Sequence, residues 1–169
     1  MKVKTEQIAV SGVLAALTVV LGATGVGFVP LPTPAGAATL MHIPVILAGI
    51  LEGSGIGSMV GLIFGLFTLR FMGDWRVVIP ARLLIGPVSY WVYVALKKKP
   101  WSLPLAAAAG SITNTVGTLA LAVTFGYIPL AGKTGALSIA AVQGMPEAIV
   151  AAVLIPPVVL AVNKALRRG

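Results

Sequence analysis

The stretch IPVILAGILEGSGIGSMVGLIFGLFTL, residues 43–69, decides how this chain folds. It contains two apolar runs, and its only charged residue, Glu52, lies in a Glu-Gly-Ser turn between them. Small residues four apart line one helix face and let helix backbones approach closely, which is how helices associate in lipid. The stretch carries such a row of glycines, at Gly49, Gly53, Gly57, Gly61 and Gly65. It therefore predicts two closely packed membrane helices.

The rest of the chain has the same apolar character. Of its 169 residues, 58% are hydrophobic and 9% are charged, too few charges to cover a soluble domain. At 1.5 Å rise per residue, a hydrocarbon core of roughly 30 Å needs about 20 residues per crossing. We expect an all-α integral membrane protein, a six-transmembrane-helix bundle that forms one domain over residues 1–169. The expected spans are 6–28, 42–52, 55–72, 77–96, 103–126 and 138–166.

A structured outer loop is expected between the first two helices. Residues 29–41 are rich in proline, which fixes φ and removes a backbone donor, so this segment is not regular helix. Non-helical backbone at membrane depth is tolerated only where protein or a water-filled cavity satisfies its polar groups. The loop is therefore predicted to form the wall of a cavity.

The basic residues predict the orientation in the membrane. With six crossings, one side carries Lys2, Lys4, Lys97, Lys98, Lys99, Lys164, Arg167 and Arg168, and the other carries Arg70, Arg76 and Lys133. Because loops rich in Lys and Arg stay in the cytoplasm, both termini are predicted to be cytoplasmic in a multi-pass protein of the cell membrane. The lysine run is interpreted as this topology signal, with contact to anionic lipid or a partner subunit as the alternative.

Two other interpretations of the basic residues are weaker. A basic N-terminus before an apolar run can indicate a secretory signal peptide cleaved near residues 35–38, but the following segments are equally apolar, and an uncleaved first span fits them better. The net charge of +8 could indicate nucleic-acid binding, but the basic residues lie at helix ends instead of on one water-facing surface. We expect no nucleic-acid partner.

The residue types exclude most chemistry. The chain has no cysteine and one histidine, which excludes disulfides, thiolate chemistry and a histidine metal cluster. It has no nucleophile with its base, no paired carboxylates, no phosphate loop and no nucleotide-binding motif. We expect a protein without catalytic activity, cofactor or metal, and a binder that depends on an external motor.

Polar residues within the spans are the candidate ligand contacts. Arg82, about one turn inside the fourth span, either grips an anionic group such as a carboxylate or anchors at the interface. Asn114 and Glu147 offer acceptors and donors to a polar solute, or pair between helices. His42 is a ligand contact or a helix-start residue, and Trp75 either stacks over a ligand or belongs to an aromatic belt. Thr39 in the outer loop and Gln143 before Glu147 complete the set.

Several segments resemble a known family. The sequence PTPAG at 32–36 leads into MHIPVILAGILEG at 41–53 and then into residues 57–66, and this block is fairly specific. PARLL at 80–84, residues 110–115 and PEA at 146–148 are similar to the later helices of the same family. Over most of its length the chain resembles the substrate-binding S components of energy-coupling factor (ECF) vitamin transporters.

The resemblance implies a six-helix bundle that binds a water-soluble vitamin beneath its first, third and fifth extracellular loops. It also implies docking on a transmembrane coupling protein and two cytoplasmic ATPase subunits, where ATP is hydrolysed. In the family, a small-xxx-small motif on the first helix contacts the coupling protein. The matching positions here are Gly12 and Ala16, with glycine in place of the more usual alanine.

The likeness is closest to pantothenate-type members, and a carboxylate ligand would explain a buried Arg82. Hydroxymethylpyrimidine, niacin and cobalamin-precursor types remain open. Outside the family, the alternatives are a self-contained secondary transporter or channel, and a small membrane enzyme or assembly scaffold.

Overall fold

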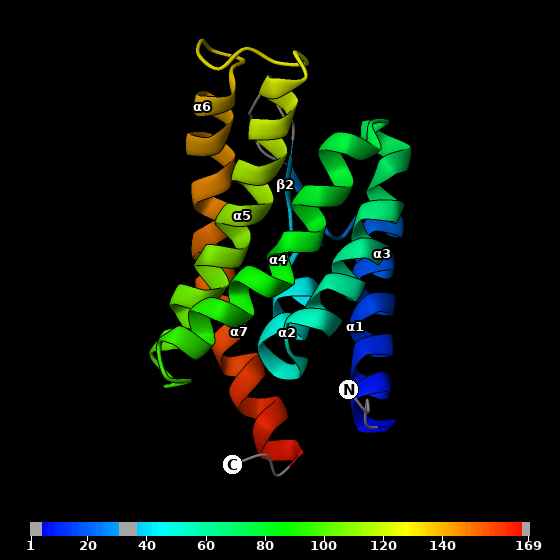
Figure 1. The fold of residues 1–169 in the computed structure, drawn as a ribbon, viewed down its shortest axis with the longest axis vertical. Helices are drawn as coiled ribbons and strands as arrows, with labels where there is room; N and C mark the ends of the chain where they lie inside the picture. The colour runs from blue at the N-terminus through cyan, green and yellow to red at the C-terminus, as the bar shows by residue number, and fades with distance from the viewer. Residues whose placement is uncertain (1–4, 31–36, 167–169) are drawn as a thin grey trace.

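The computed structural model describes residues 5–30 and 37–166, and Figure 1 shows their arrangement as a helical bundle. Two short strands, β1 (Phe28–Pro30) and β2 (Ala37–Thr39), follow the first helix. The helical elements are α1 (Thr5–Ala23), α2 (Ile43–Glu52), α3 (Ser54–Met72), α4 (Trp75–Ala95), α5 (Ser102–Thr124), α6 (Ala136–Ile139), the π-helix η1 (Ala140–Gly144) and α7 (Met145–Ala165).

The helices confirm the helical membrane character expected from the sequence. Four segments are long and apolar enough to cross a membrane: Ser54–Phe71, Trp75–Ala95, Ser102–Thr124 and Ala136–Ala165. Two shorter apolar helical segments, Gln7–Ala23 and Ile43–Glu52, complete the bundle. Helix length and composition alone therefore indicate four crossings among the described residues.

The helix boundaries follow the expected spans with one clear exception. The first helix ends at Ala23, not at residue 28, because Gly25 adopts a positive φ of 75° that stops a right-handed helix. The described residues of the loop expected at 29–41 form part of an antiparallel pair of strands, β1 and β2, with Phe28 opposite Thr39 and Pro30 opposite Ala37. Residues 31–36, at the tip of the loop, lie outside the described residues.

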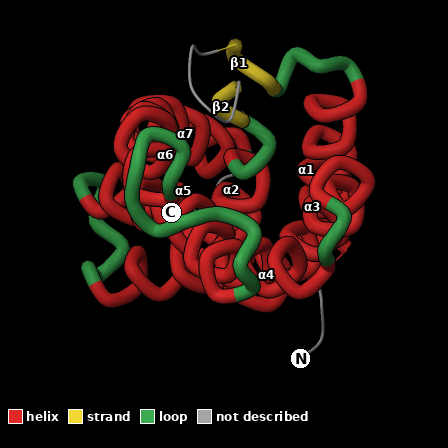
Figure 2. Tube along the Cα trace, turned by 90° about the horizontal axis from the view of Figure 1, so that it is seen from above, coloured by secondary structure: helices red, strands yellow, loops and turns green. Residues whose placement is uncertain are grey.

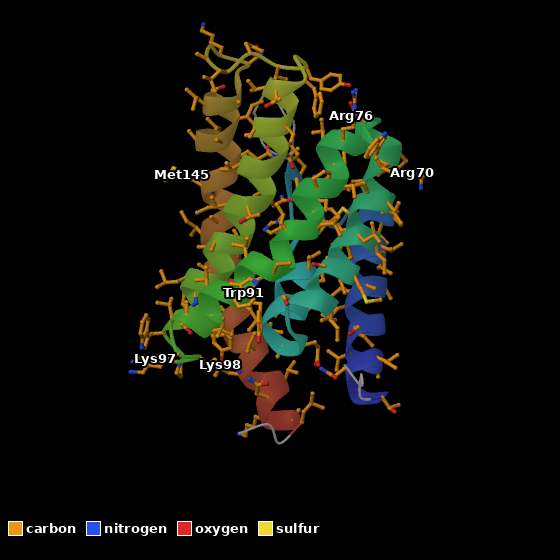
Figure 3. All side chains as sticks on the ribbon, viewed as in Figure 1. Arg70, Arg76, Trp91, Lys97, Lys98 and Met145 are labelled. Atoms are coloured by element: carbon orange, nitrogen blue, oxygen red, sulfur yellow. The ribbon has the colours of Figure 1, made fainter. Side chains whose placement is uncertain are left out.

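Apart from Arg82, the lysines and arginines of the described chain lie toward the two ends of the bundle. The start of α1 and the end of α7 lie at the same end, together with the turn between α4 and α5 (Figure 1). Figure 3 shows Lys97 and Lys98 at this end, and Arg70 and Arg76 at the opposite end. This arrangement matches the grouping expected from the sequence for these residues, while Lys2, Lys4, Arg167 and Arg168 lie outside the described part of the chain.

Glycines bring α2, α3 and α4 into backbone contact. A Cβ atom on Gly49 of α2 would lie 2.3 Å from the carbonyl oxygen of Gly86 of α4. A Cβ on Gly57 of α3 would lie 2.8 Å from the Cα atoms of both Gly49 and Gly86. We call Gly49, Gly57 and Gly86 the glycine seam. It confirms that the glycine row is a packing surface, with Gly86 as a member from outside the row.

A proline in α4 is compensated by the neighbouring helix. Pro87 has no N–H, so it leaves the carbonyl of Leu83, four residues earlier, without its helical donor. The hydroxyl of Ser58 on α3 donates to this carbonyl at 3.1 Å. Satisfying a freed carbonyl from an adjacent helix is how membrane helices tolerate proline, and it fixes α4 against α3.

Seen along the bundle in Figure 2, α1 and α3 lie on one side and α5, α6 and α7 on the other, with α2 and α4 between them. The β1–β2 ribbon lies at the rim and contacts η1 and α7 through β2. This places the outer loop beside the polar segments of the C-terminal helices.

Candidate functional site

A cavity of about 560 Å³ opens inside the bundle, within the range of about 300–1,000 Å³ usual for small-molecule sites. Its walls come from α3, α4, α5, α6, η1, α7 and the β1–β2 ribbon. Apolar atoms make up most of the surface of its lining, and its polar side chains are those of Thr39, Thr68, Asp74, Arg82, Asn114, Thr115, Thr118, Tyr127, Gln143 and Glu147.

Arg82 supplies a buried positive charge to the cavity. Its side chain is 5% exposed, and its Nη1 donates to the Thr118 hydroxyl and, at 3.5 Å, to the backbone carbonyl of Asn114. The guanidinium carbon lies 4.7 Å from the centre of the Phe64 ring, in a cation–π contact. Burial of a guanidinium in a bundle otherwise poor in charge is costly, so it favours binding of an anionic group there.

Glycines on α3 set the depth of Arg82. A Cβ on Gly61 would lie 2.3 Å from the Arg82 carbonyl oxygen, and one on Gly65 would lie 3.5 Å from the Arg82 Cβ. The backbone of α4 therefore lies directly against α3 at this position. The guanidinium lines the cavity instead of extending along the outside of the bundle.

Glu147, which is 2% exposed, accepts hydrogen bonds from three different segments at another wall of the cavity. Its Oε1 accepts from the backbone N–H of Thr39 at 2.6 Å and from Nε2 of Gln143 at 3.3 Å. Its Oε2 accepts from the hydroxyl of Thr115 at 3.3 Å. The carboxylate therefore fixes the β1–β2 ribbon to α7, η1 and α5. Its charge and that of Arg82 attract each other inside the cavity.

A second cluster joins two loops where the cavity reaches the end of the bundle opposite the termini. The carboxylate of Asp74, the N-cap of α4, accepts from Arg76 Nη2 at 2.9 Å and from the Tyr127 hydroxyl at 2.5 Å. The Arg76 guanidinium lies 4.6 Å from the Phe125 ring centre. We call Asp74, Arg76, Phe125 and Tyr127 the mouth cluster. Hydrogen bonds from Arg76 and then Tyr127 lower the pKa of Asp74 well below its usual range.

The comparisons with known proteins agree with this geometry. A family model described as "ECF transporter, substrate-specific component" matches residues 6–159. This chain belongs to that family. The chain is also 29% identical, over 154 aligned residues, to the pantothenic acid transporter PanT of Lactococcus lactis subsp. cremoris (strain MG1363). That match covers 75% of this chain and 78% of the relative.

The family consists of substrate-specific components of transporters, so membership makes this chain a transport protein. The relative is named as a transporter of pantothenic acid, which is a vitamin. Both findings agree with the resemblance seen in the motifs of the early helices.

The structure brings five of the seven candidate ligand contacts together. The cavity is lined by Thr39, Arg82, Asn114, Gln143 and Glu147. The other two lie elsewhere: His42 is fully buried and does not line the cavity, and Trp75 is 64% exposed beside the mouth cluster. Gly12 and Ala16 lie exposed on α1, and a Cβ on Gly12 would meet no atom within 4 Å.

Sequence reasoning missed several lining residues. Thr118 lies one turn after Asn114 on α5, and the spacing of Ser111, Asn114, Thr115 and Thr118 is a helical polar stripe that could have been found. Phe64 has no such signal, because an aromatic residue in an apolar helix is indistinguishable from a core residue. Its position over Arg82 depends on how α3 and α4 pack.

Proposed function

We propose that this chain binds pantothenate from outside the cell and delivers it inward as the substrate-binding subunit of an ECF transporter. The observation that carries the proposal is a buried Arg82 in a cavity of vitamin size, because a guanidinium can bind a carboxylate through paired hydrogen bonds. The pantothenic acid transporter PanT, at 29% identity, supports the choice of vitamin.

Binding of pantothenate to the detergent-purified chain tests the proposal. We expect the ligand-bound mass in native mass spectrometry and a higher apparent melting temperature, because a ligand that binds only the folded state stabilises it. Hydroxymethylpyrimidine, nicotinate and a cobalamin precursor serve as competitors. If saturating pantothenate changes neither mass nor melting temperature, the pantothenate assignment is wrong.

The proposal includes the topology expected from the sequence. Residues 1–169 form one domain with six crossings and both termini in the cytoplasm. The grouping of Lys97 and Lys98 at the terminal end of the bundle supports this orientation (Figure 3). The chain then works with a transmembrane coupling protein and two cytoplasmic ATPases, and it needs neither a cofactor nor a metal of its own. The mouth cluster lies on the outer side.

Docking on the coupling protein is predicted to depend on the exposed small residues of α1. Gly12→Leu is expected to leave pantothenate binding by the isolated chain unchanged and to abolish co-purification with the coupling protein, because the added side chain holds the helices apart. Ala120→Leu, on an exposed face of α5, is the matched control and should co-purify normally. Pantothenate uptake into liposomes by the chain alone under an ion gradient would contradict the need for a partner.

The mouth cluster is predicted to slow ligand exchange. Tyr127→Phe removes the hydroxyl that binds Asp74, so we expect association and dissociation rates both to rise about threefold or more, with little change in affinity. Stopped-flow tryptophan fluorescence can follow both rates. Tyr93→Phe removes a hydroxyl that donates to the Lys98 carbonyl near the opposite end, and it should leave both rates unchanged. Equal rates in wild type and Tyr127→Phe would exclude a role for this hydrogen bond in ligand exchange.

A further inference from the structure

The cavity offers more hydrogen-bond acceptors than its own donors satisfy. The Oδ1 atom of Asn114 and the Oε1 atom of Gln143 are buried and have no hydrogen-bond partner among the described residues. Both residues line the cavity. Buried polar atoms are nearly always hydrogen-bonded in native proteins, because each unsatisfied one costs about 1–3 kcal/mol. These oxygens therefore point to a partner that is supplied from outside the chain.

Of the five hydroxyl groups that line the cavity, that of Thr39 accepts from the Met41 N–H and makes no bond to either orphan oxygen, and the other four donate to other protein oxygens. Thr68 donates to the Phe64 carbonyl at 2.9 Å, and Thr118 donates to the Asn114 carbonyl at 2.7 Å. Thr115 donates to Glu147, and Tyr127 donates to Asp74. The hydroxyl protons of these four residues are therefore already bound to protein oxygens. Thr68 and Thr118 each donate to the backbone carbonyl four residues earlier, which is a common bond of threonine within helices.

The orientation of the Gln143 side chain follows from its neighbour. Its Nε2 donates to Glu147, so its Oε1 faces the other way. The carboxylate of Glu147 accepts two hydrogen bonds at Oε1 but one, at 3.3 Å, at Oε2, although each oxygen can accept two. With Asn114 Oδ1, these atoms place three acceptor oxygens at the cavity. We call Asn114, Gln143 and Glu147 the acceptor group.

We propose that the acceptor group selects ligands that carry at least two O–H or N–H donors in addition to the anionic group held by Arg82. This inference rests on the proposed function and specifies how the site chooses its ligand. When a ligand with too few donors binds, each acceptor oxygen that it leaves without a donor lowers the affinity for that ligand. The site therefore excludes such ligands through its unpaired oxygens as well as through its shape.

The proposed requirement separates pantothenate from two of the three ligand types that the sequence left open. Nicotinate has a carboxylate, but its ring nitrogen is an acceptor, so it brings no donor to the acceptor group. Hydroxymethylpyrimidine has amine and hydroxyl donors but no carboxylate for Arg82. Pantothenate has a carboxylate, an amide N–H and two hydroxyls, and it satisfies both requirements.

The test compares pantothenate with dideoxypantothenate, in which hydrogen replaces both hydroxyls. Isothermal titration with the wild-type chain is expected to give about 10²-fold weaker binding of the dideoxy compound, as the loss of two donors to buried acceptors predicts. The ratio of the dissociation constants of the dideoxy compound and pantothenate is expected to be about tenfold smaller in Gln143→Met, and also about tenfold smaller in Asn114→Leu, than in the wild type. The two variants lie on different helical segments, and the wild-type comparison needs no substitution, so a folding defect cannot remove the test.

Leu119→Ala is the control, because Leu119 lines the cavity without a polar side chain. This substitution is expected to weaken the binding of both compounds by the same factor and to leave the ratio of their dissociation constants unchanged. Equal affinity of the wild type for the two compounds would overturn this inference and leave the proposed function standing. An unchanged ratio in both acceptor variants would also overturn it. Failure of the wild type to bind pantothenate would overturn the proposed function and this inference together.

Discussion

The Arg82→Ala variant is expected to bind pantothenate about 10²- to 10³-fold more weakly than the wild type, as the loss of one partner from a buried, charged hydrogen bond predicts. Arg82 is 5% exposed and lines the cavity, so water cannot replace its guanidinium fully. Arg82→Lys keeps the charge but loses the planar fork, so an intermediate affinity is expected. Isothermal titration in detergent measures these affinities.

A neutral ligand gives this prediction its sharpest control. Pantothenol carries an alcohol in place of the carboxylate, so the wild type is expected to bind it weakly and Arg82→Ala is expected to bind both compounds with similar affinity. Lys133→Ala, on the exposed loop after α5, should behave as wild type. If Arg82→Ala binds pantothenate as tightly as the wild type does, Arg82 serves as an interface anchor and not as the carboxylate contact.

The Gly49→Ala variant is expected to lose about 1–3 kcal/mol of stability, the usual effect of overpacking a core. The new Cβ would lie 2.3 Å from the Gly86 carbonyl oxygen, and backbone atoms cannot move aside as a flexible side chain can. The apparent melting temperature in detergent is then expected to fall by roughly 3–10 °C, as such a change in stability predicts for a domain of this size. Thermal unfolding followed by circular dichroism measures it.

Gly55→Ala is the matched control for the glycine seam. Gly55 lies in α3, two residues before Gly57 of the seam, but a Cβ there would meet no atom within 4 Å, and alanine favours a helix more than glycine does. This variant is expected to melt at or slightly above the wild-type temperature. If Gly49→Ala and Gly55→Ala melt at the same temperature, α2 and α4 do not rely on backbone contact.

The sequence predicted most of the helices because long apolar segments separated by glycine, proline and charge leave few alternatives in a membrane protein. It placed α2 and α3 within one residue of their observed bounds. It extended the first helix too far, since the apolar residues continue past Ala23 and only the conformation of Gly25 ends it. Gly86 could not be assigned to the glycine seam, because a contact between three helices is a property of their packing.

The candidate site was predicted by a simple rule, that polar residues inside spans are expensive and therefore functional or paired. This rule selected Arg82, Asn114 and Glu147, all of which line the cavity. It could not separate them from His42, which is buried among packed helices outside that lining. It also gave no account of the partner of each group, such as the backbone N–H of Thr39 that binds Glu147.

In the proposed transporter, the shortness of α2 determines how far a solute bound in the cavity has to move to reach the cytoplasm. With 10 residues and a rise of 1.5 Å per residue, α2 is about 15 Å long, half the thickness of a hydrocarbon core of roughly 30 Å. Its N-terminal end follows Thr39 and Met41, which line the cavity, so in the proposed topology about 15 Å of helix separates this part of the cavity from the cytoplasmic end of α2. In the proposed transporter, the movement driven by the partner ATPases then has to carry a bound solute over about the length of α2, and not over the full thickness of the bilayer.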